Sequence, residues 1–252
     1  MTLPPELARH LPTPSPFDVH WMASTTSTMD AAGRLAGAGA AHATVVVADE
    51  QTAGRGRRGN RWSSPPGAGL YLSFIARPAA SRLSLLTLAA GVAVRDAIAA
   101  ASGLAVDLKW PNDVIAGRRK LAGILAEGFA VGTPDQAVVI GIGVNVQPAA
   151  YPPEVSQRAT SLERELGRSV DRGAVFAAIL ERLNARIAQL DDSPGDILRA
   201  WREASPSAIG TRVEWDSGHG LTAGIADDGA LLVETASGIE RFIAGELVWH
   251  FR

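Results

Sequence analysis

The sequence predicts an α+β fold, with a larger domain of strands and helices followed by a small β-barrel. Up to about residue 205, β-branched and alternating runs stand among stretches whose apolar residues repeat with helical spacing. Beyond Pro206, short strand-like runs are separated by turn residues at close intervals, as in small antiparallel barrels. We therefore expect a flexible leader at 1–16, a main domain at 17–205 and the barrel at 206–252.

Prolines, glycines and apolar runs define the elements in order. Five prolines before Phe17 favour a loose leader. The expected helices, each with apolar residues on one face, cover 27–35, 82–101, 173–190 and 196–203. The expected strands cover 17–22, 43–48, 69–76, 106–110, 120–129 and 136–146. The proline-containing segment 147–160 is expected to be a long mobile loop. Hairpin turns are expected at 216–218, 227–229 and 237–238.

Composition excludes several classes of function. The 252 residues carry 24 basic and 26 acidic side chains, so no overall positive field draws the chain to nucleic acid or membrane. A hydrophobic content of 46% excludes general disorder. The absence of cysteine excludes disulfides and thiolate metal sites, and the five scattered histidines lack ligand spacing. The longest apolar run, 85–94, is too short to span a bilayer, and no secretory signal is visible. A cytoplasmic location is therefore expected.

Only two of the 24 basic residues are lysines, Lys109 and Lys120. An ammonium is a compact point charge, whereas the guanidinium of arginine is a planar fork. In a chain that otherwise uses arginine throughout, we interpret the two lysines as positions where the fork cannot replace the ammonium. Chance placement is the alternative.

The loop 54–59, Gly-Arg-Gly-Arg-Arg-Gly, has the letters of a dinucleotide-binding pattern. The residues that follow, 60–67, contain two prolines and cannot begin the helix that this pattern requires. Glycine-hinged arginines can instead close on an anion such as phosphate or carboxylate. A solvated surface loop and a nucleic-acid patch remain alternatives.

A second cluster joins Lys109-Trp-Pro-Asn-Asp113 to Lys120-Leu-Ala-Gly-Ile124. Asn and Asp after Pro commonly form a turn, which is the simpler interpretation of that pair. Each lysine, however, adjoins an expected strand with apolar neighbours. A partly enclosed ammonium needs a partner, and a phosphate or carboxylate ligand would supply one.

Four segments, in this order and spacing, closely resemble biotin protein ligases (biotin–[acetyl-CoA-carboxylase] ligases): 51–59, 109–113, 120–125 and 141–145. The resemblance covers roughly 17–252. It implies a catalytic domain like that of class II aminoacyl-tRNA synthetases, with a mixed sheet and flanking helices, and an SH3-like C-terminal domain. Some members carry an N-terminal DNA-binding domain, for which the sixteen residues before Phe17 leave no room, so no DNA binding is expected.

The resemblance also implies the reaction. Biotin and ATP form biotinyl-5′-AMP and pyrophosphate with Mg²⁺, and biotin then passes to a lysine of a biotin carboxyl carrier domain. We expect a monomer or weak homodimer. A lipoate or octanoate ligase of similar fold and a nucleic-acid-binding regulator are the alternatives.

Residue roles follow from the resemblance by position. The expected catalytic residues are Lys120, Arg57 and Arg55. The expected biotin-binding residues are Ser27, Thr28, Gln51, Arg55, Gly56, Arg57 and Lys120. The expected ATP-binding residues are Arg58, Trp62, Lys109, Asn112, Asp113 and Asn145. No side chain is assigned as a direct metal ligand. Met29 stands where the family often has Asn, so this position departs from the family pattern at one polar contact with the biotin head.

Overall fold

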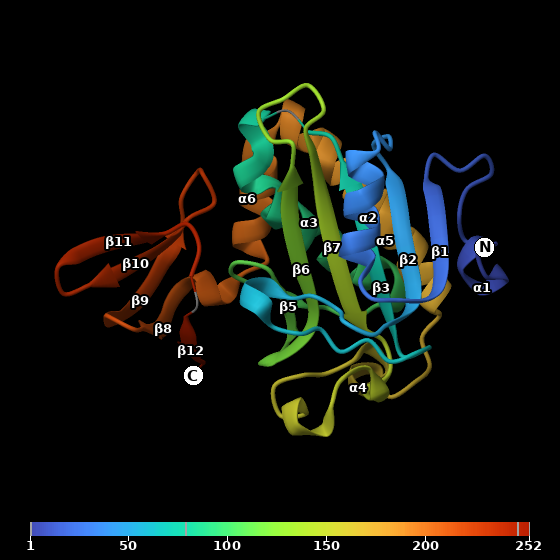
Figure 1. Ribbon diagram of the computed structural model, residues 1–252. Helices are drawn as coiled ribbons and strands as arrows, with labels where there is room; N and C mark the ends of the chain where they lie inside the picture. The colour runs from blue at the N-terminus through green and yellow to red at the C-terminus, as the bar shows by residue number, and fades with distance from the viewer. Residues whose placement is uncertain (1, 79, 246, 252) are drawn as a thin grey trace.

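A seven-stranded mixed sheet forms the centre of the larger domain (Figure 1) in a computed structural model that describes residues 2–78, 80–245 and 247–251. Its strands are β1 Asp18–Thr25, β2 Thr44–Gln51, β3 Gly69–Ala76, β4 Asp107–Lys109, β5 Asp113–Ala116, β6 Arg119–Phe129 and β7 Ala137–Asn145. The order is β1-β2-β3-β7-β6-β5-β4. β1 pairs with β2 in parallel and the other neighbours pair antiparallel, so the expected mixed sheet is confirmed.

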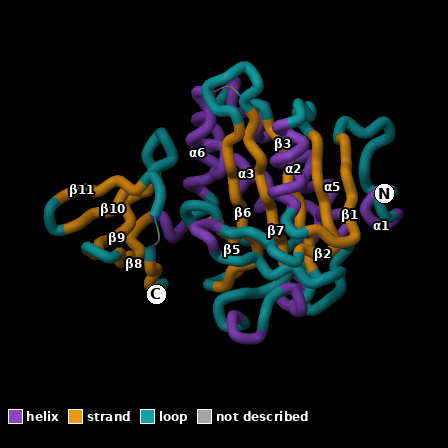
Figure 2. Tube along the Cα trace, viewed as in Figure 1, coloured by secondary structure: helices purple, strands orange, loops and turns teal. Residues whose placement is uncertain are grey.

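Helices cover both faces of this sheet (Figure 2). α2 (Thr28–Gly37) packs on one face, and α3 (Leu86–Ser102), α5 (Arg172–Asp192) and α6 (Pro194–Glu203) form the layer behind the other. Two short helices are α1 (Pro5–Ala8) and α4 (Leu162–Leu166). By length and composition, the segment Leu83–Ser102 could cross a membrane, but most of it is buried within the fold. It includes the core helix α3, which packs beside α5 on the face of the sheet opposite α2.

On the face of the sheet that α2 covers, one area carries no side chains. On β7, Ile140, Ile142 and Val144 point into the core on the α3 side. The alternate positions, which share a face with α2, include two glycines, Gly141 and Gly143. Because Gly143 pairs with Gly123 on β6, two adjacent strands lack side chains at one place. The sheet therefore has a flat floor beside the start of α2.

The small domain is an antiparallel sheet of order β11-β10-β9-β8-β12, confirming an SH3-like arrangement. Its strands are β8 Ile209–Trp215, β9 Gly218–Ile225, β10 Leu231–Thr235, β11 Gly238–Phe242 and β12 Val248–His250. The Trp110 indole N–H, from the larger domain, donates to the Gly229 carbonyl at 3.0 Å and links the two parts. A domain boundary at residue 206 stays a prediction.

The structure differs from the sequence-based expectations at several places, including the helix α4, which was not expected. The leader carries α1, which packs against α5 because Leu7 is buried in the core and Leu3 and Leu11 pack against it. The strand β5 begins directly at Asp113, where only a turn was expected. The segment 147–160 contains two short 3-10 turns, and its end pairs with Lys120. Its mobility stays a prediction.

Asp171 joins the leader to α5. Its carboxylate caps the helix by accepting from the Gly173 and Ala174 amides at 3.0 and 3.2 Å. It also contacts Arg9 at 2.8 Å and His10 at 2.9 Å. Burial raises the pKa of Asp171, but the hydrogen bonds from Ala174, His10 and Arg9 outweigh it, and the net pKa is lowered.

Asp171→Ala is expected to lower the free energy of unfolding near neutral pH by about 1 kcal/mol, the usual cost of losing an N-cap. A carboxyl with a lowered pKa stabilises the fold above its unfolded-state value, and this stabilisation disappears as the pH falls through the folded value. The difference between wild type and variant should therefore shrink in acid. Urea unfolding at about pH 7 and about pH 3 measures this change. Asp171→Asn keeps an acceptor for the cap and should lose less; an equal difference at both pH values would contradict the explanation.

Candidate active site

A large cavity, of about 1440 Å³, opens on the α2 face of the main sheet above the glycine floor. The start of α2, the loop after β2, strands β4 to β7, the segment 150–159 and the C-terminal segment all contribute to its lining. Every predicted site residue lines this cavity except Ser27. Ser27 lies at the N-cap of α2 and is fully buried, without a hydrogen-bond partner for its hydroxyl among the described residues.

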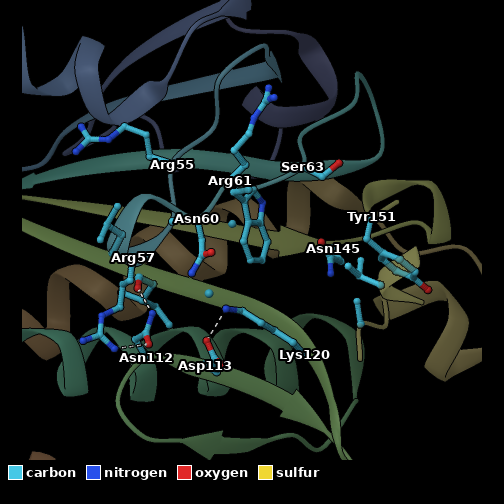
Figure 3. A pocket seen from close by; sticks show the side chains of 18 of the residues that line it. Arg55, Arg57, Asn60, Arg61, Ser63, Asn112, Asp113, Lys120, Asn145 and Tyr151 are labelled. Carbon is cyan, nitrogen blue, oxygen red and sulfur yellow. Dashed lines mark hydrogen bonds and ion pairs between the residues drawn. The ribbon is translucent and has the colours of Figure 1, made fainter. Parts of the chain in front are cut away.

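The two lysines converge on one carboxylate. Lys120 Nζ lies 2.5 Å from one oxygen of Asp113, and Lys109 Nζ lies 3.3 Å from the other. Figure 3 shows the Lys120 side chain reaching across the cavity to Asp113. The positions follow from the strands: β4 ends at Lys109, β5 begins at Asp113, and β6 carries Lys120. Two cations on one anion leave a net positive charge facing the cavity.

Trp62 lies on the glycine floor. A Cβ at Gly143 would stand 2.3 Å from its Cε2, and a Cβ at Gly123 would stand 2.9 Å from its Cζ3. The indole face lies 5.4 Å from Lys120 Nζ, within cation–π range. Its buried N–H has no partner among the described residues. The glycines are therefore needed to admit this ring, which in turn supports the ammonium.

A polar network closes the end of the cavity at α2. Gln51 Oε1 accepts from the Thr28 amide at 2.8 Å and from the Thr28 hydroxyl at 3.0 Å. Ser73, on β3, donates to the Thr28 hydroxyl, and Gln51 Nε2 donates to Ser64 at 2.8 Å. Met29 is buried beside this network, and its sulfur covers Gly141. This end offers hydrogen-bonding groups next to an apolar surface.

The arginine loop forms a short, self-bonded turn over the cavity. The Gly56 amide donates to the Asn60 carbonyl at 2.7 Å, and a Cβ at Gly56 would lie 3.1 Å from that oxygen. Arg57 Nη1 donates to Asn112 Oδ1 at 3.3 Å, on the same side as Lys120. Arg58 adopts a left-handed backbone conformation, with φ of 54°. The loop thus presents Arg57 to the region that holds the lysines.

Arg55 points away from Lys120 in Figure 3. Its guanidinium pairs with Asp30 at 2.7 Å and with Glu127. In this arrangement Arg55 fastens the loop to α2 and β6. A direct catalytic or biotin-binding role for Arg55 stays a prediction.

Asn145 was predicted from the sequence, but its partner was not: Asn145 Nδ2 donates to the Thr160 carbonyl at 2.9 Å. Three aromatic residues that line the cavity were not predicted at all. Tyr151 stands near Asn145 on the segment above the cavity. The small domain contributes Trp249 and Phe251. No local motif marks these aromatic residues, because their role depends on which segments the fold brings together.

Electrostatics set this cavity apart from the rest of the chain. Eight basic side chains line it against three acidic ones, in a protein of net charge −2. Nearby, burial raises the pKa of Tyr71, which keeps the phenol neutral. The Tyr71 hydroxyl donates to the Pro65 carbonyl at 3.1 Å and supports the loop that carries Trp62. A cavity of this charge suits anionic ligands.

Two family models match the chain: the biotin/lipoate A/B protein ligase family over residues 21–145 and the biotin protein ligase C-terminal domain over residues 212–248. The chain is 38% identical to a bifunctional ligase/repressor BirA of Bacillus subtilis over 230 residues, covering 88% of this chain and 71% of that protein. The chain belongs to the biotin protein ligase family. The resemblance expected from the four segments is therefore confirmed.

Other biotin protein ligases are similar over more of their length. The biotin–[acetyl-CoA-carboxylase] ligase of Mycobacterium tuberculosis is 38% identical over 244 residues, covering 92% of this chain and 88% of that protein. A biotin protein ligase from Aquifex aeolicus, solved in complex with biotin and ATP, superimposes with a TM-score of 0.79 at 29% identity. The match covers 92% of this chain and 98% of that chain. All predicted site residues fall within the matched range 21–145.

Proposed function

We propose that this protein is an ATP-dependent biotin protein ligase, which forms biotinyl-5′-AMP and transfers biotin to a lysine of a biotin carboxyl carrier domain. The observation that carries the proposal is the convergence of Lys109 and Lys120 on Asp113 inside a cavity rich in basic side chains. Two anions, a carboxylate and a triphosphate, must meet in the first step of this reaction. Fixed cations lower the cost of bringing them together.

In the first half-reaction, an oxygen of the biotin carboxylate attacks the α-phosphorus of ATP. The bond from that phosphorus to the bridging oxygen breaks, and pyrophosphate leaves. We assign Lys120 to the carboxylate and the α-phosphate, and Lys109 to the phosphates on the other side of Asp113. Thr28 and Gln51, at the polar end of the cavity, are assigned to the biotin head. Orientation of this kind can supply about 7–11 kcal/mol of barrier reduction.

In the second half-reaction, the amine of the carrier lysine attacks the acyl carbon, and AMP leaves with the electrons of the broken carbon–oxygen bond. The assignment of Lys120 to the carboxylate and the α-phosphate also puts an amine of the enzyme beside this reactive group. As an ammonium paired with Asp113 it has no lone pair with which to attack. The ion pair therefore protects the enzyme from acylating itself.

Mg²⁺ fits this site as a companion of the nucleotide. In the part of the chain that the structure describes, no three histidine or acidic side chains gather to hold a metal ion. Mg²⁺ commonly binds substrate phosphates with one or two protein oxygens and several waters. Asp113 and the side-chain oxygens of Asn112 and Asn145 are the lining groups that could supply them. When bound, the ion would neutralise phosphate charge.

The nearest alternative is a lipoate or octanoate ligase, since one matched family model includes lipoate ligases as well as biotin ligases. The hydrogen-bonding end formed by Thr28, Gln51 and Ser64 supports biotin, whose ureido group needs donors and acceptors. The C-terminal domain match supports the same choice. Biotin-dependent exchange of pyrophosphate into ATP tests the proposal, with lipoate as the control. Exchange with lipoate but not with biotin would overturn it.

We further propose that the acceptor is the carrier domain of a biotin-dependent carboxylase, as the names of two relatives suggest. A cytoplasmic location, a monomer or weak homodimer, and the absence of DNA binding belong to the same proposal. The net charge of −2 supports the last point. A salt titration with duplex DNA separates a ligase from a nucleic-acid-binding regulator, and tight salt-dependent binding would favour the regulator.

Arg57→Ala is expected to release free biotinyl-AMP faster than wild type. Arg57 bridges from the loop to Asn112 across the cavity, so its loss removes a contact that holds the loop over the product. Rapid filtration after single-turnover adenylation measures retention of the adenylate. Arg61→Ala is the matched control, since Arg61 bonds the Thr52 carbonyl and points away from Lys120. Equal retention in the two variants and wild type would count against this role.

A further inference from the structure

The small domain reaches into the cavity with one aromatic residue that contacts the lysine pair. Trp249 lies on β12, where it pairs with Val213 of β8. Its ring centroid stands 5.9 Å from Lys109 Nζ, within cation–π range. Phe251 stacks beside it, with ring centroids 6.2 Å apart and planes at 17°. Both rings line the cavity.

With the contact between Trp249 and Lys109, two indole rings, two ammonium groups and one carboxylate form a continuous series of contacts. Trp62 faces Lys120, Lys120 and Lys109 share Asp113, and Trp249 faces Lys109. Each ammonium therefore contacts one oxygen of the shared Asp113 carboxylate and one indole ring. The two indoles come from different domains, more than 180 positions apart in the sequence. Lys109 thus depends on a domain that supplies none of the predicted site residues.

An indole supports an ammonium differently from a carboxylate. A second carboxylate on Lys109 would cancel its charge and repel an incoming phosphate. A neutral ring attracts the ammonium through its quadrupole and leaves the full positive charge for the ligand. Packing of the ring also limits the positions that the flexible lysine can occupy. Trp249 is therefore suited to hold Lys109 ready for a phosphate.

We infer that Trp249 is a positioning residue that holds Lys109 for the phosphates of ATP, so that the small domain contributes to nucleotide binding in the first half-reaction. This inference rests on the proposed ligase function. It assigns the effect of Trp249 to ATP rather than to biotin, because Trp249 contacts Lys109, whereas the residues assigned to the biotin head are Thr28 at the start of α2 and Gln51 at the end of β2.

The test compares Trp249→Leu and Trp249→Phe in biotin-dependent pyrophosphate exchange. Trp249→Leu should raise the KM for ATP about three- to thirty-fold, the range expected for one cation–π contact. The KM for biotin and kcat should stay within about twofold. Trp249→Phe retains an aromatic face and should recover most of the ATP affinity. Should Trp249→Leu fail to fold, Trp249→Met replaces it as the variant without a ring.

Two controls separate positioning from general damage. Trp215→Leu removes another indole of the small domain, one that packs on Phe242 and does not line the cavity, so the KM for ATP should not change. Lys109→Met provides a double-mutant cycle: if Trp249 acts through Lys109, Trp249→Leu should have no further effect on ATP in that background. An unchanged KM for ATP in Trp249→Leu, or fully additive effects with Lys109→Met, would overturn the inference.

Calorimetric titration with ATP provides a readout that does not depend on turnover. Trp249→Leu should raise the Kd for ATP by the same factor as the KM. If the wild type binds ATP but shows no biotin-dependent exchange, the proposed ligase function fails, while the titration still decides the role of Trp249. Equal Kd values for wild type and Trp249→Leu would refute that role.

Discussion

Lys120→Arg is expected to lower biotin-dependent pyrophosphate exchange by about 100-fold or more, the usual cost of losing one group that stabilises developing charge. The protein should remain folded, because the side chain of Lys120 is partly exposed and faces the cavity rather than the core. The ammonium is enclosed by Asp113 at 2.5 Å and the Trp62 ring at 5.4 Å. A Cβ at Gly123 would lie 3.2 Å from it. A planar guanidinium cannot occupy this position without moving one of these groups.

Arg119→Lys is the matched control for this substitution. Arg119 is the adjacent residue on β6, and its guanidinium pairs with Glu165 at 2.6 Å, outside the cavity lining. The control exchanges the same two residue types in the opposite direction. If β6 tolerated no exchange of lysine and arginine, both variants would therefore lose activity. Near-normal exchange by Lys120→Arg would refute the argument that the site requires an ammonium.

Gly143→Ala is expected to reduce exchange by a similar factor, for a steric reason. The added methyl group would lie 2.3 Å from the Trp62 Cε2 and 2.4 Å from its Nε1, far inside van der Waals contact. The indole must leave the glycine floor and with it the face that supports Lys120. Overpacking of this kind costs about 1–3 kcal/mol of stability, so the variant should still fold. Exchange kinetics together with thermal unfolding measure both effects.

A double mutant decides whether the ring is the cause. In a Trp62→Ala background, Gly143→Ala meets no indole and should have little further effect on exchange. Gly128→Ala serves as the control on the neighbouring strand, since its methyl group would meet only the end of the Val131 side chain. A loss in the double mutant as large as the two single losses combined would contradict the steric explanation.

The sequence predicted most elements because their patterns are local. The apolar spacing of α5 and the β-branched run of β2 gave bounds within a few residues of the structure. The strand β5, with four residues, was missed because its first residue also fits a turn. The helix α1 was missed because five prolines favour a loose leader, whereas its leucines pack on the core only through the tertiary fold.

The site was predictable where motifs are contiguous and unpredictable where the fold brings segments together. The two lysines could be selected from their scarcity and their neighbours, but their shared partner, Asp113, depends on the pairing of β4 with β5 and of β5 with β6. The floor under Trp62 depends on the register that places Gly123 beside Gly143. The position of Trp249 depends on how the two domains pack. Local sequence carries none of this information.

The main chain of Lys120 fixes one end of the segment above the cavity. Its amide donates to the Arg158 carbonyl at 2.8 Å, and its carbonyl accepts from the Thr160 amide at 2.9 Å. Any inward swing of the residues around Tyr151 must therefore pivot upstream of Arg158, since beyond that point the backbone is anchored to β6. The strand β6, which carries the Lys120 ammonium, thus also anchors the C-terminal end of the segment 150–159.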